Sequence, residues 1–239
     1  MIRSLLKQLR KKLVKSSSGK YIAYLRKKGM RIGRNTIILS PGHSHIDEGR
    51  ASWIEIGDNC VLTYGISIIA HDYSWSVLRK SHDVFAPTGG GRIIIGNNVF
   101  VGVNSIILRN SSIGDNCIIG AGSVVCSTIP PNSVATGNPA KVIMSLDEFC
   151  EKRKKNALKE AVNEFCHYCD VHHTYPEASD LARFGFLFSY KNMGVINSMP
   201  SIGDKHEDFI KTYLRQKSLF DDYEAFKEYA ISQITSQNR

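Results

Sequence analysis

Branched aliphatic residues recur every six positions through the middle of this 239-residue chain. An α-helix, with about 3.6 residues per turn, would scatter such side chains around its axis. Glycine and asparagine between them also interrupt the two-residue alternation of a long strand. Each hexad is therefore predicted to be a short strand and a turn, with three hexads per triangular coil and the aliphatics stacked inside. The series comprises Ile32, Ile38, Ile56, Leu62, Ile68, Ile95, Val101, Ile107, Ile113, Ile119 and Val125.

A sandwich of short strands is the alternative, but its strands would recur about every 8–12 residues with loops of variable length. Hydrophobic residues make up 42% of the chain and charged residues 22%, as in ordinary folded proteins. No apolar stretch approaches the roughly 18 residues of a membrane span. The composition therefore excludes a disordered chain and a membrane-spanning one.

Two runs near the end of the hexads, residues 113–125 and 129–143, carry a family resemblance. The first reads IGDNCIIGAGSVV and the second IPPNSVATGNPAKVI. The segment from about 31 to 143 resembles the hexapeptide-repeat acyltransferases, in the maltose/galactoside acetyltransferase-like and polysaccharide O-acetyltransferase branch. The resemblance implies a mainly β fold, a left-handed parallel β-helix. It also implies a homotrimer with active sites between subunits, and acetyl-CoA as co-substrate.

His71 is the candidate catalytic residue. The hexads stop after Ile68 and resume at Ile93, and His71 stands where the insertion of residues 73–92 begins. A long insertion is not needed by a solenoid, so it is usually functional. A sugar hydroxyl needs a base with a pKa near the working pH, and histidine has one of about 6.5. The resemblance likewise places the catalytic histidine here.

The sequence is compatible with other roles for the histidines. His71 could be a structural corner residue, and His82 with Asp83 forms a rival pair inside the insertion. His43 and His45 lie in another break of the hexads, residues 40–52, and could reach an acceptor. Asp72 could orient the imidazole, although neighbouring residues of a strand point to opposite faces.

The resemblance also implies binding residues. The acyl donor would run along small residues and end near the segment after the repeats, with the cofactor-binding set Gly102, Val103, Ala121, Gly122, Ser127, Asn138, Pro139 and Lys141. Glycines there could equally be turning corners. The acceptor-binding candidates are Asp72, Tyr73, Trp75 and Phe100, although the aromatics could instead hold the insertion to the body. Relatives often carry Thr-Lys where this chain has Cys126-Ser127, and a basic residue where it has Met144, so Arg92 or the basic arm would have to compensate.

The two ends differ from the middle. Residues 1–34 hold twelve Lys and Arg and no Asp or Glu, whereas the rest carries 19 basic and 22 acidic residues. Residues 1–30 are predicted to form a basic amphipathic helical arm, with one apolar stripe of Ile2, Leu5, Leu6, Leu9 and Leu13. Through residues 1–34 the arm would contact an anionic membrane, or it would cap the first coil. A confined basic segment does not predict a nucleic-acid binder.

Residues 31–144 are predicted to be the β-helix domain and residues 145–239 an α-helical extension. Cys166, Cys169 and nearby histidines could suggest zinc, but no second ligand pair has the usual spacing, so no metal is expected. The apolar N-terminal run of an export signal is missing, which predicts a cytoplasmic protein, peripheral to the inner face of the membrane if the arm binds there.

The expected function is acetyl-CoA-dependent O-acetylation of a sugar hydroxyl of a bacterial surface polysaccharide (capsule, O-antigen or exopolysaccharide) or its precursor. The same scaffold could instead N-acetylate an amino-sugar nucleotide. A β-helix carbonic anhydrase would need three converging histidines, and a noncatalytic scaffold would need neither His71 nor the Asn-Pro-Ala-Lys segment.

Overall fold

The computed structural model describes residues 13–87, 89–203 and 206–237. The chain divides into two compact units, Met1–Phe149 and Cys150–Arg239, and the division lies within helix α4 (Leu146–His172). Each unit has its own apolar core.

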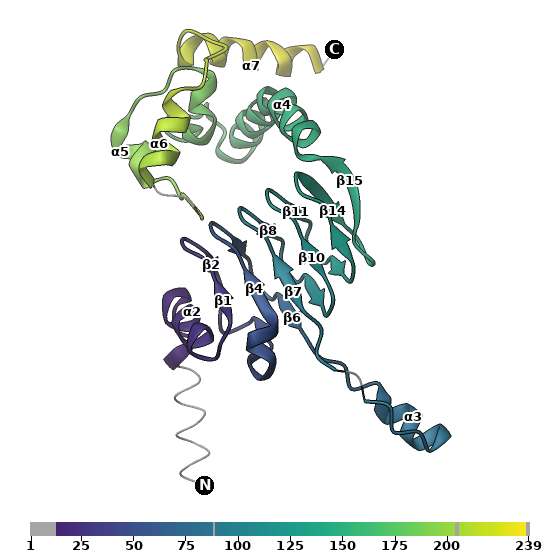
Figure 1. Cartoon of the computed structure of the whole chain (residues 1–239). Coiled ribbons are helices and arrows are strands. Elements are labelled where there is room, and N and C mark those ends of the chain that lie inside the picture. Colours follow the sequence, from purple (N-terminus) through teal and green to yellow (C-terminus); the bar gives the residue numbers. More distant parts are fainter. Residues whose placement is uncertain (1–12, 88, 204–205, 238–239) are drawn as a thin grey trace. The chain divides into compact units, whose positions relative to one another are not determined.

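The first unit is built from three sheets of very short strands, and its coils stack parallel to one another (Figure 1). The five-stranded sheet comprises β1 (Arg31–Ile32), β4 (Ile54–Ile56), β7 (Ile93–Ile95), β10 (Ser112–Ile113) and β13 (Thr128–Ile129). The six-stranded sheet comprises β2 (Ile37–Ile38), β5 (Val61–Leu62), β8 (Phe100–Val101), β11 (Ile118–Ile119), β14 (Ser133–Thr136) and β15 (Lys141–Ser145). The four-stranded sheet comprises β3 (His45–Ile46), β6 (Ser67–Ile69), β9 (Ile106–Leu108) and β12 (Val124–Val125). This is the predicted left-handed parallel β-helix.

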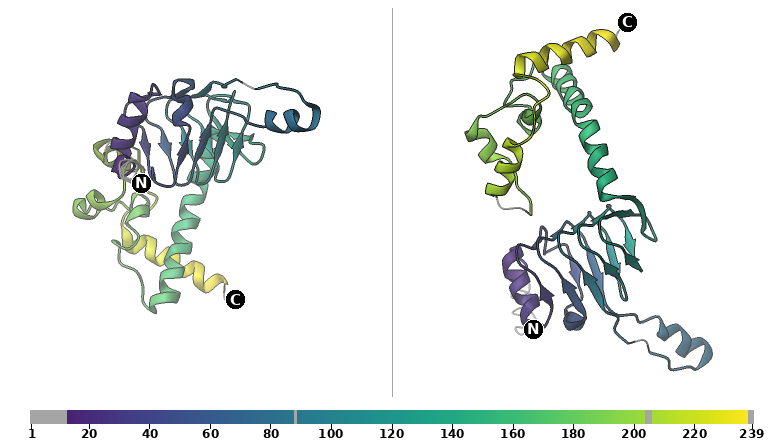
Figure 2. Two further views of the ribbon diagram at one scale, coloured as in Figure 1. Left: turned by 90° about the horizontal axis from the view of Figure 1, so that it is seen from below. Right: turned by 45° about the horizontal axis from the view of Figure 1, so that its top comes forward.

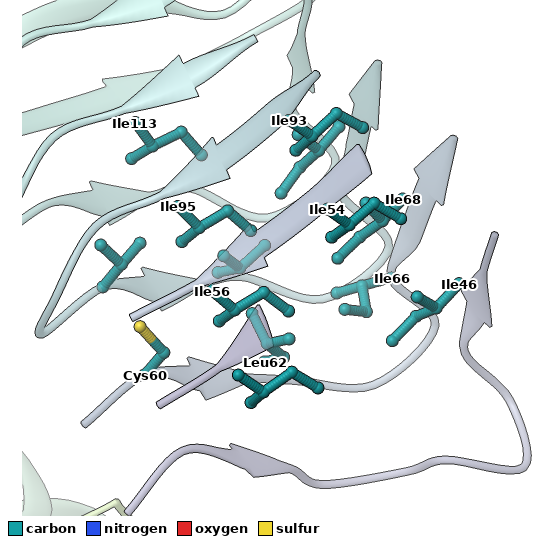
Figure 3. Packing of buried hydrophobic residues seen from close by; sticks show 14 of the residues in the cluster. Ile46, Ile54, Ile56, Cys60, Leu62, Ile66, Ile68, Ile93, Ile95 and Ile113 are labelled. Atoms are coloured by element: carbon teal, nitrogen blue, oxygen red, sulfur yellow. The ribbon is translucent and has the colours of Figure 1, made fainter. Parts of the chain in front are cut away.

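The register explains the period of six. The stacked triangular coils form a prism with one sheet on each side. Partner residues in successive coils are Ile56, Ile95 and Ile113 on one side of this prism and Leu62 and Val101 on another. Every aliphatic of the predicted series is buried, as Figure 3 shows for the central coils. The prediction of an internal aliphatic column is confirmed.

The break at residues 40–52 is only partly an insertion. Within it, β3 pairs with β6, and Ile46 is opposite Ile68 in the buried column. Ile46 stands eight residues after Ile38 instead of six, so the strict period missed it. The 3-10 helix η1 (Glu48–Trp53) follows β3 directly and returns the chain to β4.

Asparagines and glycines have different tasks at the corners. Asn98, Asn116 and Asn132 have φ values of 54° to 56°, and their side chains bond to one another from coil to coil. Asn tolerates this left-handed conformation better than most residues. Gly57 and Gly114 do not have positive φ; instead, a Cβ on either would lie 2.5 Å from the backbone of the next coil. The glycines that follow the aliphatics are thus set by close approach of the coils.

Helix α2 (Ser18–Lys27) packs on the first coil. Its residues Tyr21, Ile22 and Leu25 are buried in the core of the β-helix, and Leu13 is exposed. The rest of the predicted stripe, Ile2 to Leu9, lies outside the described residues. Membrane contact through residues 1–34 therefore stays a prediction, whereas α2 covers the end of the apolar column.

The insertion after β6 leaves the prism as two extended legs joined by helix α3 (Trp75–His82) (Figures 1 and 2). None of the residues of α3 is buried.

Helix α4 begins where β15 ends. Ser145 and Glu148 form a reciprocal capping box, in which the Ser145 amide donates to the Glu148 carboxylate and the Glu148 amide donates to Ser145 Oγ. The second unit adds the 3-10 helix η2 (Ala182–Leu187) and helices α5 (Met193–Ser198), α6 (His206–Leu214) and α7 (Tyr223–Gln237). Phe165, Phe188 and Phe226 lie at the centre of its core. In the part of the chain that the structure describes, no helix is both long and apolar enough to cross a membrane.

Candidate functional site

His71 lies two residues beyond the end of β6, where the insertion begins. Its Nδ1 is 2.6 Å from Oδ2 of Asp47, and its side chain retains 25% of its exposure. An ionised carboxylate only accepts hydrogen bonds, so Nδ1 carries the proton in the neutral ring. The lone pair of that imidazole is therefore on Nε2, the nitrogen that a general base would use.

Asp47 is held by four donors. Its Oδ1 accepts from the backbone amides of Gly49 and Arg50, both at 3.2 Å, and caps η1. Its Oδ2 accepts from the Ala70 amide at 3.3 Å as well as from His71. The carboxylate is 7% exposed, which leaves it little freedom to rotate. Asp47 is thus a fixed partner for the imidazole.

Sequence reasoning missed Asp47, because it is 24 residues from His71. A signal existed. Ile46 and Ile68 are opposite one another in β3 and β6, so the residues that follow these strands meet at one corner of the prism. Once Ile46 is placed in the column, Asp47 and His71 are expected to be neighbours.

Asp72 and Tyr73 flank the imidazole on the insertion side. The Tyr73 ring is 4.7 Å from the His71 ring between centroids, and Tyr73 is 66% exposed. Asp72 accepts from the Ser74 amide at 2.8 Å and faces Arg109 at 3.6 Å. The Ser74 hydrogen bonds, more than Arg109, hold the pKa of Asp72 below its usual value. Asp72 is therefore anionic, and the carboxylate that contacts Nδ1 of His71 is Asp47.

The two aromatic candidates on the insertion have different surroundings. Trp75 begins α3 and packs edge-on against Phe85, with centroids 5.1 Å apart, so it joins the two legs of the insertion. Tyr73 lies beside His71 instead. The rival histidine, His82, ends α3 and contacts Ser81 Oγ at 2.7 Å through Nδ1.

The histidines of the other break lie on the surface. His43 stacks on Tyr64, with ring centroids 4.7 Å apart, and accepts or donates at Ser40 Oγ. His45 is exposed on β3.

The residues expected to hold the acyl donor form an exposed strip along one corner of the prism. Val103 lies in one coil and Ala121 and Gly122 in the next, and Asn138, Pro139 and Lys141 follow near β15, all of them exposed. A Cβ on Gly122 would meet nothing within 4 Å, so this part of the strip is open.

Gly102 differs from the rest of that strip. It is buried, and a Cβ there would lie 2.5 Å from the Ala121 amide nitrogen, so its small size serves the stacking of coils. The amides of Gly102 and Gly122 donate to the carbonyls of Ile119 and Val103. Neither amide is therefore available to an incoming ligand.

Two further candidates stand apart from His71 within one chain. Phe100 is 42% exposed on β8, in the six-stranded sheet, whereas His71 follows a strand of the four-stranded sheet. Ser127 is exposed beyond β12, next to the exposed Cys126. Arg92, expected to compensate for missing cations, is paired with Glu55, as is Arg31.

Among the described residues, no group of three or more His, Cys, Asp and Glu is arranged to hold a metal ion. Cys166 and Cys169 pack against the core of the second unit, and burial raises the pKa of both thiols. They behave as small apolar residues in α4.

The chain has clear relatives. Residues 92–127 match the family model for the bacterial transferase hexapeptide, six repeats. Protein CapG of Staphylococcus aureus is 37% identical over 133 residues, which are 56% of this chain and 76% of CapG. YvoF of Bacillus subtilis (strain 168) is 32% identical over 104 residues, 44% of this chain and 55% of YvoF. Galactoside O-acetyltransferase of Escherichia coli (strain K12) is 38% identical over 97 residues, 40% of this chain and 45% of that protein.

The chain therefore spans about half the length of the last two relatives and three quarters of CapG. Among solved structures, the hexapeptide-repeat-containing acetyltransferase VCA0836 from Vibrio cholerae has a TM-score of 0.45 at 23% identity. That match covers 61% of this chain and 92% of that chain. All of these similarities leave a large part of this chain unmatched.

Proposed function

The chain belongs to the hexapeptide-repeat transferase family, and we propose that it is an acetyl-CoA-dependent O-acetyltransferase. Its acceptor is a sugar hydroxyl of a bacterial surface polysaccharide or of its precursor. The single observation that carries the proposal is the pairing of His71 Nδ1 with Asp47, which leaves Nε2 as the basic nitrogen of a one-quarter-exposed imidazole at the insertion boundary. The similarity to galactoside O-acetyltransferase of Escherichia coli supports a sugar hydroxyl as the acceptor.

The pair performs the proton transfers that the reaction needs. Acetyl-CoA, when bound, supplies an electrophilic thioester. His71 takes the proton of the acceptor hydroxyl on Nε2 as the oxygen attacks, and returns it to the leaving sulfur. Between these transfers the imidazolium is stabilised by the ionised Asp47 at 2.6 Å. Such a positioned base contributes roughly 10²–10⁴-fold to the rate.

Tyr73, Asp72 and the exposed strip supply binding surfaces. Tyr73, exposed beside the imidazole, offers a ring face to a sugar, and anionic Asp72 offers acceptor oxygens to its hydroxyls. The pantetheine arm runs along Val103, Ala121 and Gly122, where small side chains and open space fit a narrow ligand. Lys141, exposed at the end of the strip with Asn138 and Pro139, faces the nucleotide end.

A homotrimer would complete the site. Leu39, Tyr64, Phe100 and Val103 are 42–47% exposed, and all lie on the six-stranded sheet or the corner beside it. Exposed apolar residues gathered on one face mark an interface. In a trimer this face would bring Phe100 and the strip of one subunit toward His71 of the next.

Phe100→Glu is expected to give monomers in sedimentation and to abolish acetyl transfer, with the β-sheet circular dichroism retained. A variant that stays trimeric would contradict the assignment of this face as the interface.

The proposal is tested by measuring release of CoA. Wild type, His71→Ala and the control His82→Ala are incubated with acetyl-CoA and methyl glycosides, surface-glycan repeat units or amino-sugar nucleotides. CoA is quantified by chromatography, because exposed Cys126 and Cys150 would react with a thiol reagent. His71→Ala should lose roughly 10²–10⁴-fold in kcat while still binding acetyl-CoA, and His82→Ala should stay active.

The acceptor panel decides between transfer to oxygen and to nitrogen. Turnover with hydroxyl acceptors alone supports the proposal, whereas turnover only with an amino-sugar nucleotide would replace it by N-acetylation. Full activity of His71→Ala would exclude His71 as the base. A chain that does not bind acetyl-CoA would be a scaffold.

A further inference from the structure

Two tyrosines of helix α2 hold one carboxylate of η1. Tyr24 donates its hydroxyl to Oε2 of Glu48 at 3.0 Å, and Tyr21 donates to Oε1 at 3.4 Å. The two rings lie nearly parallel, with an interplanar angle of 14°. Because the tyrosines are three residues apart, they lie on one face of α2 and converge on a single side chain.

Glu48 is the residue next to Asp47 and the first residue of η1. Asp47 caps η1 with Oδ1 and contacts His71 with Oδ2. The chain of contacts therefore runs from α2 through Glu48 and the first turn of η1 to the imidazole. A shift of that turn would rotate the carboxylate that orients His71.

We call the contact of Tyr21 and Tyr24 with Glu48 the clamp. The attachment of α2 to the prism does not require it. Ile22 and Leu25 are buried in the core. Arg26 donates to the carbonyls of Ile32 and Gly33, and the Ile38 amide donates to Ser18 Oγ. The polar contacts of Arg26 and Ser18 are with the first coil and not with η1, so α2 has anchors other than Glu48.

The clamp is also well defined electrostatically. Burial raises the pKa of the Tyr21 hydroxyl far above its usual value, and the charge of Glu48 adds to the effect. The hydroxyl is therefore a stable donor. Lys15 gives a second link to the same region, because its ammonium donates to the Ser44 carbonyl at 2.9 Å and lies over the Tyr21 ring.

We propose that Glu48 is a positioning residue for the transfer reaction, held by Tyr21 and Tyr24 so that Asp47 keeps His71 in its reactive orientation. The inference rests on the proposed function. It makes α2 a part of the catalytic machinery as well as the cover of the first coil.

The test compares Glu48→Ala, Glu48→Gln and the double variant Tyr21→Phe/Tyr24→Phe with the control Arg26→Ala. The control removes polar contacts of α2 on its other side. For each full-length protein we would measure the melting temperature, kcat, KM for acetyl-CoA and the proton resonance of His71 Nδ1–H in histidine-labelled protein. The resonance needs no acceptor.

Glu48→Ala and the double variant should lose roughly 10- to 100-fold in kcat, with KM for acetyl-CoA unchanged and the Nδ1–H resonance broadened or shifted. Glu48→Gln should recover most of the rate, because its amide can pair with both tyrosine hydroxyls. Arg26→Ala should melt at a lower temperature with kcat within about twofold of wild type. If Glu48→Ala does not fold, Tyr24→Phe removes the shorter bond and carries the test.

Two outcomes overturn the inference separately from the proposed function. If Glu48→Ala melts lower but keeps kcat and the Nδ1–H resonance, Glu48 is a structural contact only, even though His71→Ala is inactive. If Arg26→Ala loses as much kcat as Glu48→Ala, any loosening of α2 has the same effect and the clamp is not special. Activity of His71→Ala would instead remove the proposed function itself.

Discussion

At the scale of single residues, the site depends on one carboxylate with no spare hydrogen-bonding capacity. Asp47 receives amides from Gly49 and Arg50 on one oxygen, and the Ala70 amide and the His71 ring on the other. All four partners are donors, and an ionised carboxylate accepts at both oxygens and carries no donor of its own. An isosteric amide cannot replace it.

Asp47→Asn is expected to lower kcat by roughly 10²-fold or more. With its oxygen toward η1, the new amide would point N–H groups at the Ala70 amide and at Nδ1 of His71, which favours the wrong tautomer. The unpaired Ala70 amide adds an expected loss of about 1–3 kcal/mol in stability. Steady-state kinetics and urea unfolding check both effects. A variant with normal kcat would show that Asp47 does not orient the base.

Tyr213 makes the second unit sensitive to alkaline pH. Its hydroxyl donates to the Ala182 carbonyl at 2.9 Å, and burial raises its pKa to about 12. The unfolded value is about 10, so the stabilisation is complete below about pH 10 and is lost as the pH rises through about 12. At pH 7, Tyr213→Phe should be less stable than wild type by about 1 kcal/mol, because the hydrogen bond is lost. This difference in unfolding free energy should close between about pH 10 and 12. Unfolding followed by helical circular dichroism measures the difference at each pH. A difference that stays constant from about pH 7 to 12 would contradict the prediction.

At the scale of elements, the insertion is fastened to the prism by its return leg. The Gly91 amide donates to the carbonyl of Ala70, the residue before His71. A Cβ on Gly90 would be 3.1 Å from the Trp53 ring, and one on Gly91 would be 2.5 Å from Asn110 Oδ1 and 2.7 Å from the Arg109 Cβ. Two glycines therefore let the leg pass between η1 and the Arg109 corner.

Gly91→Ala should displace this leg and, through Ala70, the imidazole of His71. We expect kcat to fall roughly 10- to 100-fold, since a displacement of about 1 Å is enough for such a loss. Gly89→Ala is the matched control, because a Cβ there meets nothing within 4 Å. The kcat of the two variants shows whether the return leg positions His71. Binding of acetyl-CoA serves as a check that each variant is folded. Equal rates would mean that the leg does not position the site.

At the scale of the whole molecule, the chain has two cores with no residue in common. The β-helix core is a stack of aliphatics, whereas the second core is rich in aromatic residues and is built from α4, η2, α7 and the segments between them. Helix α4 belongs to both units, because the division falls at Phe149. Separate cores predict separate unfolding transitions.

Phe165→Ala should destabilise only the second unit. The ring is fully buried and packs against Tyr175 and Phe226, so its removal costs about 3–5 kcal/mol. Scanning calorimetry should show one transition moved to a lower temperature and the β-helix transition unchanged. Transitions that move together would show that the two units unfold cooperatively.

The sequence by itself determined the β-helix. A period of six fits neither the 3.6-residue turn of an α-helix nor the two-residue alternation of a long strand. Each aliphatic in the series faces inward because each coil repeats the geometry of the one below. It also determined where the chemistry would be sought, because His71 stands at the longest departure from the repeat. A local pattern was sufficient for both, since neighbouring coils are related by a constant register.

Only the tertiary structure decided which groups meet His71. Asp47 contacts His71 itself, whereas Arg109 and Gly91 contact its neighbours Asp72 and Ala70. The irregular length between Ile38 and Ile46 hid the coil that carries Asp47. The role of α2 was hidden for a similar reason: the apolar stripe of residues 2–13 is stronger in sequence than the buried face of Tyr21, Ile22 and Leu25. Contacts across coils depend on how many residues each irregular turn contains, and that number leaves no periodic trace in the sequence.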